Sequence, residues 1–87
     1  MWSPLVSPSP LEQATRLIAD AQIGLEIRGY PPRLVRNAIE RARGAAVAKV
    51  AAVSPAIRDQ AFLDVLKGEL KGVEQWMQQV ESFLKTS

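Results

Sequence analysis

The chain has 87 residues, enough for one small domain, and its net charge of +2 is too small to indicate a class of partner. It contains no cysteine and no histidine, which excludes disulfides, thiol chemistry, histidine general bases and the usual zinc sites. No apolar run reaches the roughly 20 residues that a helix needs to cross a bilayer. We therefore predict no membrane span and a cytoplasmic location.

Residues 1–9 are predicted to be a flexible arm, because prolines and serines recur there and do not sustain a helix. A first helix is predicted over about residues 10–28. Ser9 is its expected N-cap, and Glu12 stands three residues later, as in a capping box. Gly29, followed by Tyr-Pro-Pro, is expected to stop it. One face carries apolar residues at heptad steps: Leu11, Ala14, Ile18, Ala21 and Leu25.

A second helix is predicted over about residues 32–53. Its core face is expected to consist of Val35, Ile39, Ala42 and Ala46. After Gly44 the sequence is apolar on nearly every side, with Lys49 as the only charge. Alanine is a good helix former and is tolerable in water, but the three valines in this segment, Val47, Val50 and Val53, are expected to need burial. We therefore predict that it contacts another chain.

A third and longest helix is predicted over about residues 55–85. Its apolar seam alternates steps of three and four residues, which is typical of a helix packing lengthwise against another: Leu63, Leu66, Leu70, Val73, Met77, Val80 and Leu84. Phe62, Trp76 and Phe83 widen this stripe. Gly68 and Gly72 lie four residues apart and indicate either a close backbone approach or a kink.

These elements predict an all-α protein: a three-helix bundle, or a helical hairpin with an extra N-terminal helix, ending in a long C-terminal helix. At 1.5 Å per residue the third helix would be about 45 Å long, against about 33 Å and 26 Å for the second and first. We therefore expect the long helix to extend past its neighbours and to carry apolar side chains that they do not cover.

No residue is assigned a catalytic, cofactor-binding or metal-binding role. The carboxylates are spread along polar faces, and none stands in a Glu-x-x-His pattern because histidine is absent. A small bundle also leaves little room for the concave site that an enzyme needs. The sequence therefore favours a protein that is not an enzyme.

The excess of apolar helix surface favours a protein–protein interaction subunit: a small helical adaptor, assembly factor or co-chaperone. The partner is predicted to be a second copy, forming a homodimer, or a larger helical protein, forming a hetero-complex. In size and helical-hairpin plan the chain is similar to small secretion co-chaperones that steady a larger helical chaperone, a similarity of plan without a shared motif. The predicted partner-binding residues are Val47, Val50, Val53, Leu66, Leu70, Val73, Trp76, Met77, Val80 and Phe83.

The alternative is a small nucleic-acid-binding regulatory protein. Between Arg28 and Lys49 there are six basic residues and one acidic residue, and Arg33, Arg36 and Arg43 would form a stripe able to meet phosphates. No aromatic residue lies between Arg33 and Arg43 to stack on bases. A solvated arginine face is therefore favoured over nucleic-acid recognition.

Overall fold

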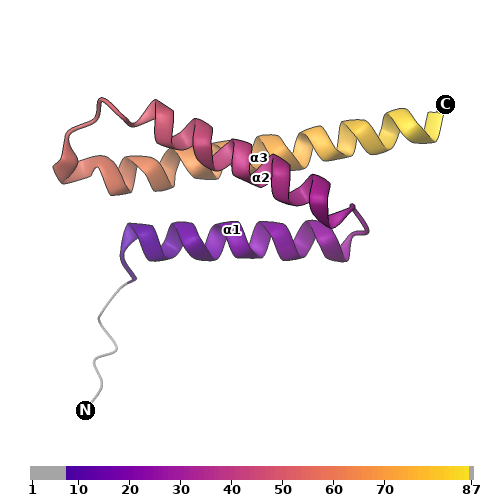
Figure 1. Cartoon of the computed structure of the whole chain (residues 1–87), viewed down its shortest axis with the longest axis horizontal. Coiled ribbons are helices and arrows are strands. Elements are labelled where there is room, and N and C mark those ends of the chain that lie inside the picture. Colours follow the sequence, from indigo (N-terminus) through magenta and orange to yellow (C-terminus); the bar gives the residue numbers. More distant parts are fainter. Residues whose placement is uncertain (1–7, 87) are drawn as a thin grey trace, which may run out of the picture.

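Figure 1 shows the computed structural model of the chain, which describes residues 8–86. These residues form three helices and no strand: α1 (Pro10–Ile27), α2 (Pro32–Lys49) and α3 (Pro55–Thr86). The all-α class and the long C-terminal helix are thereby confirmed. Of the predicted arm, residues 1–7 lie outside the described part of the chain.

The helices alternate in direction along the chain. α1 and α3 point in the same direction. α2, the middle helix in the sequence, points the opposite way and crosses the face of α3 (Figure 1). Both shorter helices pack mainly on α3 and contact each other less. With 32 residues against 18 in each of the others, α3 is about 48 Å long against about 27 Å. Its C-terminal end extends past the turn between α1 and α2 (Figure 1).

Local hydrogen bonds fix both ends of α1. At its start, the Ser9 hydroxyl accepts a hydrogen bond from the backbone N–H of Glu12 at 3.2 Å, which satisfies one of the free amides of the first turn. At its end, Gly29 N–H donates to Glu26 O at 3.0 Å and Tyr30 N–H donates to Leu25 O at 3.3 Å. This is the Schellman pair of bonds, and Gly29 has the positive φ, +99°, that the motif requires.

α2 ends at Lys49, four residues before the predicted end at residue 53. Val50 N–H still bonds to Ala46 O at 3.2 Å, but the next bonds are of the tighter turn type, and Val53 N–H donates to Val50 O at 3.0 Å. Proline disfavours helical backbone angles in the residue that precedes it. Ser54, before Pro55, therefore cannot continue α2 directly into α3. The Arg58 guanidinium donates to Val53 O at 2.9 and 3.2 Å, which ties this turn to the start of α3.

The core lies where α1 and α2 meet the seam of α3. It combines alanines and larger apolar residues on the two shorter helices with large residues on α3, so that the layers fit together. Leu66 and Met77 have no exposed surface; burying a side chain of this size stabilises the fold by about 1.5–3 kcal/mol. The cluster consists of Ala14, Leu25, Val35, Ile39, Ala42, Ala46, Leu63, Leu66, Leu70 and Met77.

The glycines of α3 do not serve a close approach within the described chain. α3 continues through Gly68 and Gly72 as one helix, and a Cβ added at either would meet no atom of a neighbouring segment within 4 Å. Both positions are exposed. The close backbone approach proposed from the sequence is therefore not made by the described helices themselves.

We expect Gly29→Ala to lower the free energy of unfolding by about 1–2 kcal/mol, because alanine is strained at the positive φ of this position. Urea denaturation monitored by circular dichroism measures this change. As the matched control, Gly68→Ala should raise the free energy of unfolding by up to about 1 kcal/mol, since it adds a helix former in open space. Equal stability of Gly29→Ala and the unaltered chain would contradict the role given to this turn.

Candidate partner-binding surfaces

Four of the residues predicted to bind a partner lie in the chain's own interior. Leu66, Leu70 and Met77 belong to the core cluster, and Val50 is 4% exposed. We correct their assignment from partner contacts to core residues. The physical reason for Leu66, Leu70 and Met77 is that α1 and α2 both pack on the seam of α3 and cover these side chains. Val50 is buried at the C-cap of α2, where the chain turns toward α3. A heptad seam has the same spacing whether its partner helix belongs to the same chain or to another.

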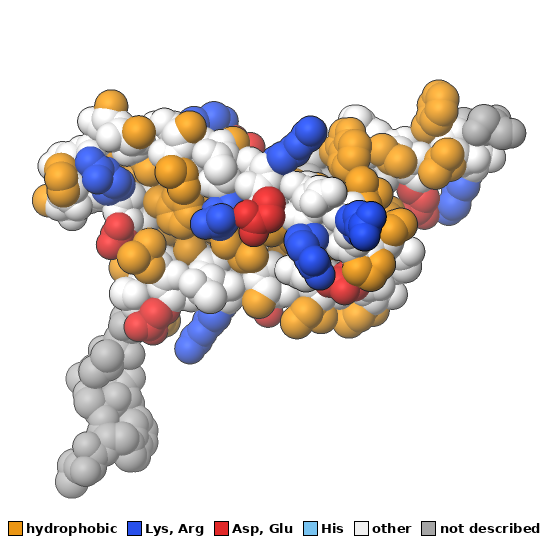
Figure 2. All heavy atoms as spheres, in the orientation of Figure 1, with side chains coloured by type: hydrophobic (Ala, Val, Ile, Leu, Met, Phe, Trp, Pro, Cys, Tyr) orange, Lys and Arg blue, Asp and Glu red, His pale blue; other side chains and the backbone are white. Residues whose placement is uncertain are grey.

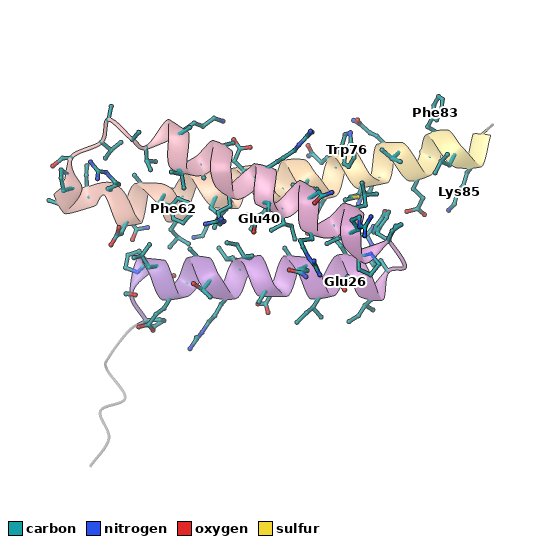
Figure 3. The ribbon with its side chains drawn as sticks, viewed as in Figure 1. Glu26, Glu40, Phe62, Trp76, Phe83 and Lys85 are labelled. Carbon is teal, nitrogen blue, oxygen red and sulfur yellow. The ribbon has the colours of Figure 1, made fainter. Side chains whose placement is uncertain are left out.

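The other predicted contacts are reachable from solvent. Val53, Val73 and Val80 are half-buried. Val47, Trp76 and Phe83 are exposed, with 51%, 46% and 71% of their surface accessible. Trp76 and Phe83 both project from the upper edge of α3 (Figure 3). Figure 2 shows hydrophobic side chains at the surface near both ends of the molecule.

The first candidate site is the α2–α3 groove, a cavity of about 620 Å³ lined by Leu34, Asn37, Ala38, Glu40, Arg41 and Trp76. Leu34, Ala38 and Arg41 follow helical spacing of four and three residues, so they lie on one face of α2. Leu34 and Ala38 are half-buried, and Trp76 lies across from them on α3. The result is an apolar surface with a few polar groups, which is the composition usual for a protein-binding site.

The second candidate site is the α2-end groove, a cavity of about 510 Å³ at the opposite end of α2. All the helices contribute to it: the lining residues are Leu11, Arg43, Val47, Val50, Ala51, Arg58, Asp59 and Phe62. Phe62 lies on the part of α3 that faces α1 (Figure 3). Leu11, expected on the core face of the first helix, is instead 49% exposed here. It lies in the first turn of α1.

The predicted basic stripe on α2 is only partly available to phosphates. Arg33, Arg36 and Arg43 are all exposed, but Arg43 bonds to Glu40 at 2.9 Å. Lys49, the last residue of the basic stretch, pairs with Glu69 of α3. Within residues 8–86, Arg33 and Arg36 form no ion pair. The stripe is therefore reduced to these two arginines near the start of the helix.

A clasp between the α1–α2 turn and α3 fixes the position of the exposed end of α3. The Tyr30 hydroxyl donates to Glu81 Oε2 at 2.5 Å, and Lys85 pairs with the same carboxylate at 3.1 Å. The Arg28 guanidinium lies 5.6 Å from the centre of the Tyr30 ring, within the range of a cation–π contact. The two partners of the clasp are 51 positions apart in sequence, so no local pattern could have paired them.

This clasp shifts the ionisation of both of its members. The hydrogen bond to Glu81 raises the pKa of Tyr30, because it holds the hydroxyl proton, with desolvation and the carboxylate charge acting in the same direction. The hydrogen bond from Tyr30 lowers the pKa of Glu81, because it stabilises the carboxylate, and Lys85 adds to this effect.

Sequence reasoning missed three exposed isoleucines. Ile23 and Ile27 are 56% and 79% exposed on α1, and Ile57 is 60% exposed at the start of α3. The signal for the first two was present, since an apolar pair four residues apart lies off the predicted seam of that helix. None of the three lines either groove.

No known protein family, curated protein or solved structure matches the chain. Within residues 8–86, no helix combines the length and the apolar character needed to span a bilayer. In the same part of the chain, no three acidic side chains are grouped so that they could hold a metal ion.

We expect Tyr30→Phe to raise the pKa of Glu81 toward its ordinary value, because the hydrogen bond that stabilises the carboxylate is removed. Carboxyl carbon NMR titration measures this shift, and the remote carboxylate of Glu12 serves as the internal control.

The same change has a signed effect on stability. Since folding lowers the pKa of Glu81, the stabilisation from the clasp is present above the ordinary pKa of the carboxyl and is lost as pH falls through the folded value. The unaltered chain should therefore exceed Tyr30→Phe in stability at neutral pH and lose that advantage in acid. An advantage that persisted below the folded pKa would contradict this assignment.

Proposed function

We propose that the chain is a non-enzymatic protein–protein interaction subunit, a small helical adaptor, assembly factor or co-chaperone, that binds through the α2–α3 groove. The observation that carries this proposal is Trp76, which remains 46% exposed beside the half-buried Leu34 and Ala38, whereas the next residue, Met77, is fully buried in the core. A tryptophan offers 150–250 Å² for burial, so covering its exposed half would contribute about 2 kcal/mol.

The groove also has the features that distinguish binding hot spots from scattered surface hydrophobic residues. Tryptophan and arginine are enriched among residues that dominate binding energy, and the groove holds Trp76 and Arg41 together. Arg41 forms no ion pair within residues 8–86, whereas Glu40 is held by Arg43. We propose that the partner is a second copy of the chain or a larger helical protein, and that binding takes place in the cytoplasm.

We expect Trp76→Ser to weaken partner binding at least about tenfold, because it removes the central apolar side chain of the groove. Affinity capture with the full chain, followed by titration of the captured protein, measures this change. Ile23→Ser is the matched control, since Ile23 is somewhat more exposed than Trp76 but lies outside both grooves. Equal capture by both variants would contradict the groove as the binding site, and a chain that neither captures a protein nor self-associates would contradict the function.

Nucleic-acid binding remains the second candidate, and one observation favours it: Arg33 and Arg36 are exposed and form no ion pair within the described residues. Under our proposal, fluorescence anisotropy with short DNA and RNA duplexes at low ionic strength should show no binding. Binding that falls steeply with salt and disappears in the double variant Arg33→Ala plus Arg36→Ala would establish the alternative instead.

A further inference from the structure

α3 carries a second row of residues beside its buried seam, which we call the outer row: Gly72, Trp76, Gln79 and Phe83. Their steps of four, three and four residues place them on one face of the helix. All of them are exposed. The outer row begins beside the α2–α3 groove, where Trp76 is part of the lining, and it continues along the C-terminal end of α3 (Figure 3).

The spacing of the outer row is the same read in either direction. An antiparallel pair of identical helices related by a two-fold axis would therefore match each position with another member of the row. Gly72 would face Phe83 of the second copy, and Trp76 would face Gln79. Each pairing sets a large ring against a smaller side chain or none, which is how packed helices fill space. The surface above Gly72 is open, since an added Cβ there would meet nothing within 4 Å.

The charges around the outer row also suit a second copy. Two identical faces bring like charges together unless the face is neutral. On α3 the exposed neighbours Gln75, Gln78 and Ser82 are uncharged. The exposed charges beside the row are Lys71 at its N-terminal end and Arg41 of α2, which lines the groove with Trp76. The carboxylates of this part of α3 lie elsewhere: Glu74 lines a hollow beside Leu17 and Asp20 of α1, and Glu81 is held by Tyr30 and Lys85.

We propose that a second copy of this chain docks antiparallel on the outer row, so that the two α3 helices pair about a two-fold axis and each Trp76 is covered. This inference rests on the proposed function, because it names the partner that the α2–α3 groove receives. The row spans about three helical turns, less than a standard interface of about 1,600 Å² requires from helices alone. We therefore expect association in the micromolar range.

Sedimentation of the full chain from about 1 to about 500 µM tests the pairing. The unaltered chain should pass from monomer to dimer across this range. Gly72→Leu places a side chain in the space that Phe83 of the second copy would occupy. It should therefore raise the dissociation constant of the dimer at least about tenfold. Gly44→Leu is the matched control: it lies on α2, in equally open space and away from the outer row, and should leave dimerisation unchanged. Both variants add a better helix former and should fold.

Cross-linking tests the direction of pairing, and the chain has no native cysteine to interfere. A mixture of Gly72→Cys and Phe83→Cys chains should form a disulfide-linked dimer on mild oxidation. Gly72→Cys alone should not, because antiparallel pairing separates the two copies of that position by about 16 Å along the axis. Efficient linkage of Gly72→Cys to itself would instead indicate parallel pairing and would overturn the proposal.

The remaining outcomes separate this inference from the function it rests on. A monomer at every concentration overturns the second copy as partner, while Trp76-dependent capture of a different protein would still support an interaction subunit. A dimer that is insensitive to Gly72→Leu overturns the outer row as its interface. Absence of both dimer and captured protein overturns the inference and the function together.

Discussion

The fold depends on one mismatch of length between helices that must cover each other. α3 has 32 residues and offers a seam of large apolar side chains along most of them, whereas α1 and α2 have 18 residues each. The two shorter helices pack on the seam and bury Leu63, Leu66, Leu70 and Met77. They do not cover the whole circumference of α3, so Trp76, beside α2, and Phe83, near the C-terminal end, stay exposed.

Two connections decide how far this cover reaches. At one end the clasp between Tyr30 and Glu81 holds the α1–α2 turn against α3, and the last turn of α3 extends beyond it (Figure 1). At the other end Arg58 holds the Val53 carbonyl, which fixes the turn between α2 and α3. The α2-end groove lies beside the second connection, since Arg58 is part of its lining, and both grooves are lined by apolar side chains together with acidic and basic ones. The exposed surface is therefore a consequence of how the core is closed.

The exposed glycines and uncharged side chains of α3 are consistent with a surface that packs against another helix. Two glycines in a helix interior weaken it by roughly 1 kcal/mol each relative to alanine, and neither is needed for packing within the described chain. On α3 itself, the exposed residues next to Trp76 in the sequence include the neutral amides Gln75, Gln78 and Gln79, while Glu81 is held by Tyr30 and Lys85. A helix stabilised only for solubility would carry more paired charges on such a face.

The sequence by itself determined the helical class and most helix boundaries, because prolines mark the starts at Pro10, Pro32 and Pro55 and Gly29 marks one end. The heptad spacing also identified Leu66, Leu70 and Met77 as residues that must be covered. Only the tertiary structure decided what covers them, since heptad packing has the same pattern within a chain and between chains. It also decided where α2 ends, because alanine continues a helix by propensity while the return to α3 requires a turn. The clasp of Tyr30 with Glu81 joins residues brought together by the fold alone.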